Sequence, residues 1–484
     1  MNIASVTNMR LKFPGKESLL FSDFSLSIKE GEKVLILGPS GCGKSTLLQV
    51  LSGLIPKTVD VPMKADEITV PHSWGYLFQD PDAQFCMPYV DEEIAFVLEN
   101  LEVPREKMPD CITSYLRQVG LAFENNHTKI STLSGGMKQR LALASVLALE
   151  PEVIFLDEPT AMLDPDGTTQ VWDTIKQIGD DKTLIIIEHK IDQIVDVVDR
   201  IILLGKNGNI IAEGPKQVIF EGYKQKLKEA GIWYPGVWDD YLEENQPDRT
   251  IEPVNNQPPA ITLSDFSGYR GKKEIVHIDY AEARLGEWIT VIGENGAGKS
   301  TLLLALMNLV QSAGTYDING RDHKKVTNFA EEMAFVFQNP EYQFVTNSVY
   351  DEVAFTLRLE KREEAEISSR VSDSLHFYQL EEEQDNHPYQ LSIGQKRRLS
   401  VAASLIKDQP ILLLDEPTFG QDAKNTFAIL EQLEQVRKRG AAILMVTHDT
   451  KVVEHFATRV WQLEDGKLIK NVPASEYPQE PVHA

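Results

Sequence analysis

Short apolar runs alternate with segments of helical pattern along the whole chain. KVLILG, VIFLDEP and TLIIIEH stand in the first half, and WITVIG, ILLLDEP and AILMVTH follow in the same order in the second half. Short runs rich in Ile, Leu and Val are typical of parallel strands that helices cover on both faces. The pattern therefore predicts an α/β fold for each half of the chain.

The second half repeats the motifs of the first half. The glycine-rich stretch GPSGCGKST around Lys44 returns as GENGAGKST around Lys299, 255 residues later. Asp157 and Asp415 are 258 residues apart, and several other landmarks keep nearly the same spacing. Matching landmarks in one register predict a tandem duplication of a whole domain.

A change in composition marks the boundary between the two copies. We place the first domain at residues 1–232, a linker at 233–260 and the second domain at 261–484. Within the linker, residues 236–260 include six acidic residues, one basic residue and four prolines. This composition predicts a solvated, semi-extended linker.

Length and composition limit the class of protein. The 484 residues, 42% hydrophobic and 25% charged, are typical of a folded chain that is too long for one core. No apolar run approaches the ~20 residues that cross a bilayer, and the N-terminus lacks a secretion-signal pattern, so we expect a cytosolic location. Three cysteines without CxxC spacing argue against a disulfide framework or a zinc site. The net charge of -25 argues against nucleic-acid binding.

Both glycine-rich stretches match the phosphate-loop pattern G-x-x-x-x-G-K-[ST]. Glycines let backbone N–H groups turn toward phosphate oxygens, and a helix that starts at the lysine adds its positive dipole. The lysine reaches the β and γ phosphates, and the next serine can ligate Mg2+. A glycine turn without a ligand is the alternative for a single match, but two copies after apolar runs make it negligible. The candidate nucleotide-binding residues are Gly38, Ser40, Gly41, Gly43, Lys44, Ser45 and Thr46, and Gly293, Asn295, Gly296, Gly298, Lys299, Ser300 and Thr301.

Two carboxylates follow a buried apolar run in each copy. Asp157 or Asp415 is placed to hold Mg2+, and the next residue, Glu158 or Glu416, can polarise an attacking water. Capping of the next helix is the alternative, but it explains only one carboxylate of each pair.

A histidine follows a later apolar run in each copy. His189 and His448 are placed where an imidazole can contact the γ phosphate and the attacking water. A lone histidine is more often structural than catalytic, and the matched register of the two favours the catalytic interpretation.

The stretches LSGGMKQR and LSIGQKRR place serine and glycine at an expected helix start, which is an anion site. Capping of the same helix is the alternative. The candidate residues here are Ser134, Gly135 and Gly136, and Ser392, Gly394 and Gln395.

Phosphate loop, glutamine, LSGGQ-like signature, DE pair and histidine, in this order, closely resemble the nucleotide-binding domains of ABC ATPases. The resemblance covers nearly the whole chain twice. It implies two tandem P-loop domains, each with a mostly parallel core sheet, an antiparallel β part and a helical subdomain. It also implies ATP and Mg2+ as cofactors and a head-to-tail pairing of the domains. One ATP would lie between the phosphate loop of the first copy and the second signature, and the other between the remaining two.

Further residue roles follow from the resemblance. Phe13 and Tyr269 match the aromatic residue that stacks on adenine, with core packing as the alternative for Phe13. Gln79 and Gln338 match the Q-loop glutamine that senses the γ phosphate. The Mg2+ ligands implied are Ser45, Gln79 and Asp157, and Ser300, Gln338 and Asp415.

The chain departs from the family pattern at several positions. Ile393 replaces the first glycine of the second signature, and Met137 replaces the final glutamine of the first. The first copy keeps the usual Leu163 and Asp164 after the DE pair, whereas the second copy reads FGQDAK. We therefore predict two competent but unequal sites, of which the one that uses Ser392 and Ile393 is slower.

The stretch FQDPDAQF returns as FQNPEYQF, and P-x-x-Q-F after the glutamine resembles the ATPases of energy-coupling factor (ECF) importers. There the segment forms a short helix beside the groove that receives the transmembrane coupling protein. Pro81 and Pro340 suit the first turn of a helix, and we expect Gln84 and Gln343 on the side that faces the partner. An exposed turn that begins with proline is the alternative.

The resemblance implies an ATPase at the cytoplasmic face of the membrane that powers vitamin uptake, with thiamine or its pyrimidine precursor as a weak indication. Its partners would be a transmembrane coupling subunit and a small substrate-binding membrane subunit, in contact with Gln79 to Phe85 and Gln338 to Phe344. The alternatives are the tandem ATPase of a monosaccharide importer and a soluble tandem ATPase that acts on ribosomes.

Overall fold

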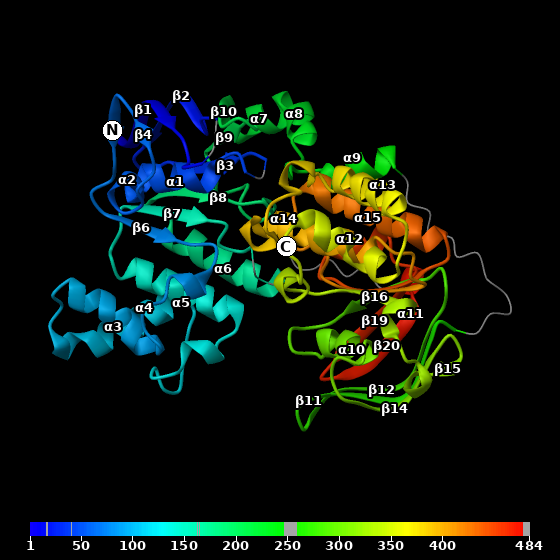
Figure 1. Cartoon of the computed structure of the whole chain (residues 1–484). Helices are drawn as coiled ribbons and strands as arrows, with labels where there is room; N and C mark the ends of the chain where they lie inside the picture. The colour runs from blue at the N-terminus through cyan, green and yellow to red at the C-terminus, as the bar shows by residue number, and fades with distance from the viewer. Residues whose placement is uncertain (16–17, 40, 162, 164, 246–258, 478–484) are drawn as a thin grey trace. The chain divides into compact units, whose positions relative to one another are not determined.

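The computed structural model describes residues 1–484 except 16–17, 40, 162, 164, 246–258 and 478–484. The chain divides into two compact units (Figure 1). Unit 1 consists of Met1–Val237 with Asp422–Lys424, and unit 2 of Trp238–Gln421 with Asn425–Ala484.

Unit 1 contains a six-stranded sheet in the order β10-β9-β3-β8-β7-β6 and a smaller antiparallel sheet in which β1 pairs with β2, β4 and β5. In the larger sheet every neighbouring pair is parallel except β9 and β10. The strands are β1 (Asn2–Leu11), β2 (Phe21–Lys29), β3 (Lys33–Leu37), β4 (Met63–Lys64), β5 (Glu67–Thr69), β6 (Trp74–Leu77), β7 (Val153–Asp157), β8 (Thr183–Ile187), β9 (Arg200–Leu204) and β10 (Ile210–Pro215).

Helix α1 packs between the two sheets of unit 1, and α3, α4 and α5 form a helical part next to β6 (Figure 1). The apolar runs that predicted parallel strands are β3, β7 and β8, and nearly every residue in them is buried. The helices are α1 (Lys44–Ser52), α2 (Leu54–Lys57), α3 (Val90–Asn100), α4 (Met108–Gln118), α5 (Gly135–Leu147), α6 (Pro165–Ile178), α7 (Lys216–Gly222) and α8 (Lys224–Glu229).

Unit 2 repeats this plan in one continuous ten-stranded sheet, in the order β15-β14-β11-β12-β20-β19-β13-β18-β17-β16. The strands from β19 to β16 are parallel, whereas β11, β12, β14 and β15 form the antiparallel part. The strands are β11 (Ile261–Arg270), β12 (Lys273–Ala283), β13 (Trp288–Ile292), β14 (Ser312–Ile318), β15 (Arg321–Asp322), β16 (Met333–Val336), β17 (Ile411–Asp415), β18 (Ala442–Val446), β19 (Arg459–Glu464) and β20 (Lys467–Pro473).

Two apolar cores cover the parallel strands of unit 2. One joins them to α10 and the antiparallel part, and the other joins them to α12, α13, α14 and α15. The predicted α/β fold with parallel core, antiparallel part and helical subdomain is confirmed. The helices are α10 (Lys299–Leu306), α11 (Phe329–Glu332), α12 (Val349–Leu359), α13 (Glu364–Phe377), α14 (Ile393–Leu405), α15 (Ala423–Lys438) and α16 (Thr450–His455).

Part of the segment predicted as an extended linker is a packed helix, α9 (Val237–Glu244). Tyr241 is 7% exposed and stacks on Phe427 with ring centroids 4.0 Å apart, and Trp238 meets the same ring edge-on. The prediction of a solvated segment is wrong here, because two aromatic rings in the acidic stretch bury against unit 2. The rest of the predicted linker, at 246–258, lies outside the described residues.

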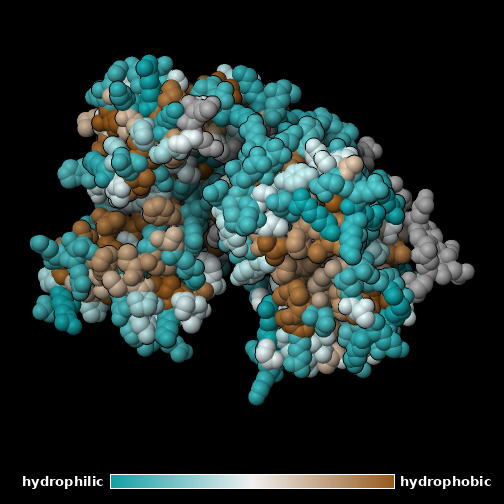
Figure 2. Space-filling view, in the orientation of Figure 1, coloured by the Kyte–Doolittle hydropathy of each residue, from teal (hydrophilic) through white to brown (hydrophobic). Residues whose placement is uncertain are grey.

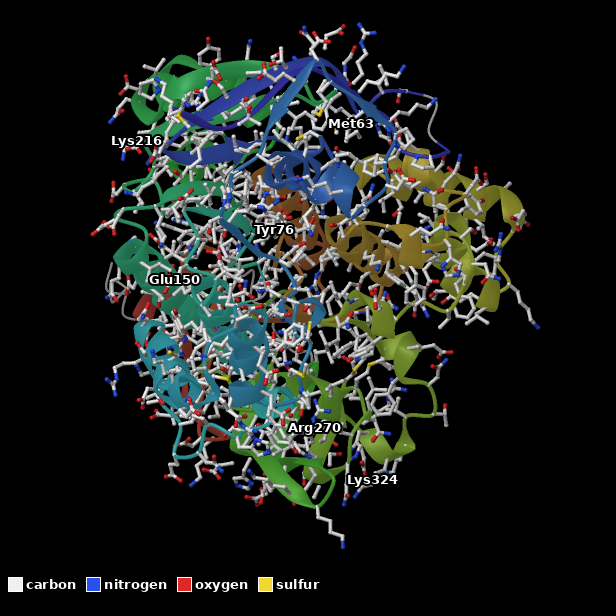
Figure 3. The ribbon with its side chains drawn as sticks, turned by 90° about the vertical axis from the view of Figure 1, so that its left-hand side faces the viewer. Met63, Tyr76, Glu150, Lys216, Arg270 and Lys324 are labelled. Atoms are coloured by element: carbon white, nitrogen blue, oxygen red, sulfur yellow. The ribbon has the colours of Figure 1, made fainter. Side chains whose placement is uncertain are left out.

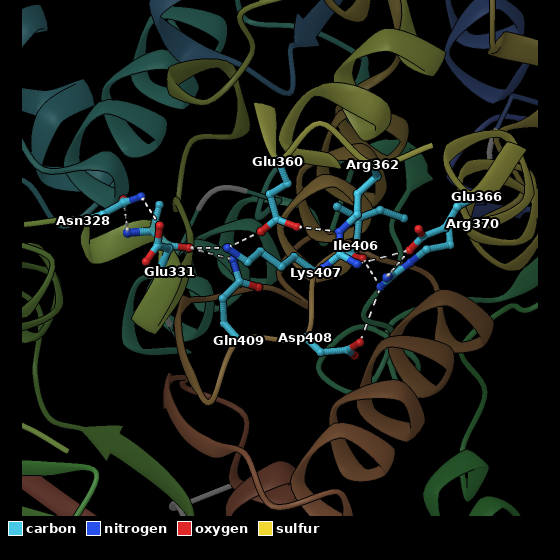
Figure 4. Close-up of polar contacts among 11 residues, drawn as sticks. Asn328, Glu331, Glu360, Arg362, Glu366, Arg370, Ile406, Lys407, Asp408 and Gln409 are labelled. Atoms are coloured by element: carbon cyan, nitrogen blue, oxygen red, sulfur yellow. Dashed lines mark hydrogen bonds and ion pairs between the residues drawn. The ribbon is translucent and has the colours of Figure 1, made fainter. Parts of the chain in front are cut away.

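Charged side chains join the helical part of unit 2 to the loop before β17 (Figure 4). Lys407 pairs with Glu360, which follows α12, at 2.5 Å. Arg370 of α13 pairs with Asp408 at 3.5 Å and donates to the backbone oxygen of Ile406. These contacts hold α12 and α13 against the core at one end.

Unit 1 has apolar side chains at the matching positions. In the register of the repeat, Leu101 stands where unit 2 has Glu360, and Leu149 where it has Lys407. The two leucines are 47% and 39% exposed. The two units therefore differ in surface chemistry at this point.

In the part of the chain that the structure describes, no helix is both long and apolar enough to span a bilayer.

Candidate functional site

The order of the strands brings three predicted motifs together in each unit. β3, β8 and β7 are neighbours in unit 1, and β13, β18 and β17 are neighbours in unit 2. The phosphate loop, the DE pair and the histidine each follow the carboxyl end of one of these strands. Carboxyl ends of parallel strands meet at one edge of a sheet, which is where such folds bind ligands.

The first phosphate loop is built as the sequence predicts. Helix α1 begins at Lys44, and Gly43 before it has φ 100°. A Cβ on Gly43 would come within 2.8 Å of the Phe21 ring, so both the left-handed backbone and the packing require glycine here. The Nζ atom of Lys44 donates to the backbone oxygens of Gly38 and Pro39 at 2.8 and 3.2 Å. The ammonium group of Lys44 and the N-terminus of α1 thus both lie at the loop.

The second phosphate loop has the same geometry. Helix α10 begins at Lys299 after Gly298, whose φ is 94°. Lys299 donates to the backbone oxygens of Gly293 and Glu294 at 2.7 and 2.9 Å.

The remaining loop residues divide by exposure. Gly41, Ser45, Asn295 and Gly296 are exposed, Thr46 and Ser300 are half-buried, and Thr301 is buried and accepts a bond from Arg270. Ser40 lies outside the described residues.

Ser45 and Asp157 lie together, as a shared cation requires. The Ser45 hydroxyl donates to Asp157 Oδ1 at 2.9 Å, and the Tyr76 hydroxyl donates to Oδ2 at 2.9 Å. Tyr76 is labelled in Figure 3. Burial raises the pKa of Asp157 above its ordinary value, although both hydroxyls act against that shift. Serine and carboxylate oxygens are ligands that Mg2+ prefers, so these residues fit the ion.

The matching aspartate of unit 2 has fewer partners. Asp415 is bonded to Ser300, but Phe335 stands where unit 1 has Tyr76, and Asp415 Oδ1 is buried without a hydrogen bond. Burial raises the pKa of Asp415 to about 6. An unpaired buried oxygen beside the phosphate loop also fits a cation.

Glu158 and His189 form a close pair in unit 1. His189 Nε2 lies 3.0 Å from Glu158 Oε1, and the Gln79 amide donates to Glu158 Oε2 at 2.7 Å. Burial alone would raise the pKa of Glu158, but His189 and Lys44 outweigh it and hold that pKa below its usual value. The glutamate is thus kept ionised, as a base requires.

The pair recurs in unit 2 with different neighbours. His448 Nε2 lies 3.2 Å from Glu416 Oε1, whereas Gln338 is exposed. Arg397, where unit 1 has Gln139, is 5% exposed, and its charge acts on Glu416 and Asp415. Burial lowers the pKa of Arg397 to about 10.

Both signatures start a helix, as predicted. Ser134 caps α5 and accepts from the backbone N–H of Met137 at 3.3 Å, and Ser392 caps α14 and accepts from that of Gln395. The Gln395 side chain in turn accepts from the N–H of Ser392 and donates to Glu383. Ser134, Gly135 and Ser392 are exposed, and Gly136 and Gly394 are half-buried.

The two predicted adenine-stacking residues lie at or after the first strand of each unit. Phe13 follows β1 and is 39% exposed, so it is not part of the core. Tyr269 lies in β11 and is half-buried.

The segments after Gln79 and Gln338 form one-turn 3-10 helices, η1 (Pro81–Ala83) and η5 (Pro340–Tyr342). Each has its proline at the start and is capped by the preceding side chain, Asp80 or Asn339. The predicted short helices are confirmed.

The expected orientation of the following glutamines is wrong. Gln84 accepts from the N–H of Phe78 at 3.2 Å and donates to the α5 backbone at Ala142. Gln343 donates to Ser400 O and Ser404 Oγ and accepts from the Ser400 hydroxyl, all on α14. Both amides point inward, because the signature helix behind them supplies polar partners.

Three residues with roles at these sites were not among the predicted ones. They are Tyr76, Arg397 and Glu188, a buried carboxyl beside His189. The only signal in the sequence was the mismatch between copies: Phe335, Gln139 and Thr447 stand at the corresponding positions.

Comparison with known proteins gives consistent matches. Residues 21–161 and 280–419 match the family model described as ABC transporter. A Bacillus subtilis protein provisionally named HMP/thiamine import ATP-binding protein YkoD is 36% identical, over 99% of this chain and 93% of that protein. A Methanosarcina mazei protein, provisionally named ABC transporter ATP-binding protein, is 31% identical over 97% and 88%.

A solved structure shares the fold. It is the crystal structure of archaeal ribosome recycling factor aABCE1 with ribosomal stalk protein aP1, and it covers 96% of this chain and 90% of that chain. Its TM-score is 0.63 and its sequence identity 20%, which supports the fold alone.

Proposed function

Because the chain belongs to the ABC transporter family and is one of its ATPases, we propose that it is the energy-coupling subunit of an ECF-type importer. It binds and hydrolyses ATP and works through a transmembrane coupling subunit and a small substrate-binding membrane subunit. The chain itself is peripheral, at the cytoplasmic face of the membrane.

Each unit contributes one half of each nucleotide site in this proposal. The first phosphate loop, Gln79, Asp157, Glu158 and His189 act with Ser392 and Gly394 of the second signature. The matching residues of unit 2 act with Ser134 and Gly136. ATP binding draws the halves together because these contacts exist only in the closed form, and hydrolysis releases them.

The hydrolytic step uses the Glu–His pair. Glu158, kept ionised by His189 and Lys44, accepts a proton from the attacking water, and His189 holds the carboxylate in place. Lys44 and the α1 N-terminus bind the phosphates. Mg2+, when bound at Ser45 and Asp157, neutralises phosphate charge.

One observation carries the transport proposal. In each unit, an ion pair and hydrogen bonds join the short helix after the Q-loop glutamine to the signature helix. Lys138 of α5 pairs with Asp82 of η1 at 2.7 Å, and Lys396 of α14 pairs with Glu341 of η5 at 2.5 Å. The inward-facing glutamines add hydrogen bonds between the same elements. A displacement of either helix is therefore transmitted to the other.

Exposed apolar side chains lie beside these short helices. In unit 2, Tyr342, Val345, Phe355 and Leu359 are between 40% and 76% exposed. Figure 2 shows hydrophobic surface around α12 of unit 2 and over the helical part of unit 1. Such patches are typical of protein interaction sites, and helices of a membrane subunit are the partner we propose.

The relative provisionally named for HMP/thiamine import, 36% identical over nearly the whole chain, supports thiamine or its pyrimidine precursor as the transported substrate.

The test is mass spectrometry of the proteins that co-purify with the tagged chain, extracted from its own cells in mild detergent. We expect one larger and one small integral membrane protein. Val345→Asp, at a side chain 65% exposed, is expected to lose them while it keeps ATPase activity. Cys86→Asp is the matched variant at the corresponding exposed position of unit 1. Recovery of ribosomal proteins, or of no membrane protein, contradicts the transport function and leaves the ATPase.

A further inference from the structure

A buried carboxyl group lies beside the Glu158–His189 pair, and the corresponding position of unit 2 is a threonine, Thr447. Glu188 follows β8 directly and is 4% exposed. Such a group stays in the interior only where it has hydrogen-bond partners or a function that requires it.

Glu188 bonds to both loops that carry the pair. Its Oε2 accepts from the Thr160 hydroxyl at 2.7 Å, in the loop after Glu158. Its Oε1 accepts from the backbone N–H of His189 at 2.9 Å. Glu188 therefore fixes the loop of the glutamate relative to the loop of the histidine.

The charge on Glu188 depends on its surroundings. Burial raises its pKa to about 7, and Glu158 adds to this shift, while Thr160 and His189 oppose it. Glu158 and His189 are the titratable groups that act on it. Both the neutral and the ionised form accept a hydrogen bond, so the connection between the loops persists in each.

Unit 2 lacks this connection. Thr447 stands at the position of Glu188, and its hydroxyl accepts from the N–H of Asp449 within the same loop. Among the described residues of unit 2, no hydrogen bond joins Thr447 to Thr418, the counterpart of Thr160. The His448–Glu416 distance is 3.2 Å, against 3.0 Å in unit 1.

We propose that Glu188 is a positioning residue of the first ATP site, which holds the Glu158 carboxylate against His189 through Thr160 and the His189 backbone, and that the second site works without such a device. This inference rests on the ATP hydrolysis proposed for these residues. It is a further difference between the two sites, and it favours the first site, opposite in direction to the effect predicted for Ile393 of the second signature.

The test compares apolar and conservative replacements. Glu188→Leu keeps the size of the side chain but removes both bonds, whereas Glu188→Gln retains one acceptor and one donor, enough to hold the His189 N–H and the Thr160 oxygen. In a Glu416→Gln chain, which reports the first site, Glu188→Leu is expected to lower kcat about tenfold with KM for ATP unchanged. Glu188→Gln is expected to restore kcat to within about twofold.

The matched control lies in the other copy. In a Glu158→Gln chain, which reports the second site, Thr447→Leu is expected to leave kcat within about twofold, whereas Glu188→Leu in the Glu416→Gln chain lowers kcat about tenfold. A Glu416→Gln chain without ATPase activity would count against two competent sites and would overturn the proposal. Binding of a fluorescent ATP analogue shows that each variant is folded.

Equal relative losses of kcat for Glu188→Leu and Thr447→Leu, each measured in the chain that reports its own site, would overturn the proposal. So would a Glu188→Leu variant that binds ATP weakly and that Glu188→Gln does not rescue, because the role would then be purely structural. An unaltered chain without ATPase activity would instead contradict the proposed function.

Discussion

At the scale of single residues, the two sites share their motif side chains and differ in the neighbours of those side chains. Asp157 has two hydroxyl partners, whereas Asp415 keeps one buried oxygen unpaired because Phe335 lacks the hydroxyl of Tyr76. The motif residues were predictable because their spacing is fixed by the ligand. Tyr76 and Glu188 were not, because they gain their roles only from contacts far away in sequence.

Removal of the Tyr76 hydroxyl should expose this difference. Tyr76→Phe leaves one buried oxygen of Asp157 unpaired, so we expect a loss of about 1–3 kcal/mol in the free energy of unfolding of unit 1. The reverse change, Phe335→Tyr, offers Asp415 a donor and should not destabilise unit 2. Urea denaturation without Mg2+ measures the free energy of unfolding of both variants. Equal losses for the two would contradict the proposed difference between Asp157 and Asp415.

The pKa of Glu188 predicts a pH dependence of stability. Its folded-state pKa of about 7 lies above the ordinary 4.5, so the folded state holds the proton more tightly. Protonation of Glu188 therefore contributes about 3 kcal/mol to the free energy of unfolding. This contribution is fully present below pH 4.5 and is lost as the pH rises through 7. Glu188→Gln removes this loss. Compared with the unaltered chain, the variant should therefore gain stability between pH 5 and pH 8 in urea titrations. A difference in the free energy of unfolding that does not change with pH would contradict the raised pKa of Glu188.

At the scale of elements, the strands and the capped helices followed from apolar periodicity and motif position. The orientation of η1 and η5 did not, because the partners of Gln84 and Gln343 lie on helices about 60 residues later. Helix α9 was missed because acidic residues and the prolines beyond it dominate the composition of its segment, while two aromatic rings decide its packing.

The inward-facing glutamines give a matched pair of variants. Gln343 makes three hydrogen bonds with α14, between 2.8 and 3.0 Å, whereas Gln84 makes two longer ones, at 3.2 and 3.4 Å. We expect Gln343→Leu to cost about 2–3 kcal/mol and Gln84→Leu about 1 kcal/mol, because more partners are left unpaired in unit 2. Denaturation followed by tryptophan fluorescence measures both. A partner-facing role would instead leave stability unchanged and reduce membrane-protein recovery.

At the scale of the whole molecule, duplication has been followed by divergence of the two units. Unit 1 has Glu188, Tyr76 and exposed leucines, where unit 2 has Thr447, Phe335 and an ion-pair network around Lys407. The repeat itself was evident from the motifs. The differences were visible only as mismatched letters, and the structure gives several of them a physical meaning.

Unequal sites predict unequal effects of matched substitutions. Glu158→Gln and Glu416→Gln each remove the proposed base from one site. We expect the residual ATPase rates to differ, with the slower site being the one that uses Ser392 and Ile393, so that Glu158→Gln removes the smaller share. Steady-state phosphate release measures both, with ATP binding as the control for folding. Equal residual rates would contradict the asymmetry.

Helix α9 has a consequence for how such a gene can divide. A break in the coding sequence between Glu244 and Pro259 would leave α9 at the C-terminus of the first product, while the surface that covers Trp238 and Tyr241 would remain on the second. The two polypeptides would then have a ready-made docking peptide and its receptor. A fused ancestor of this kind could give rise to a heterodimer in one step, with recognition between the subunits already in place.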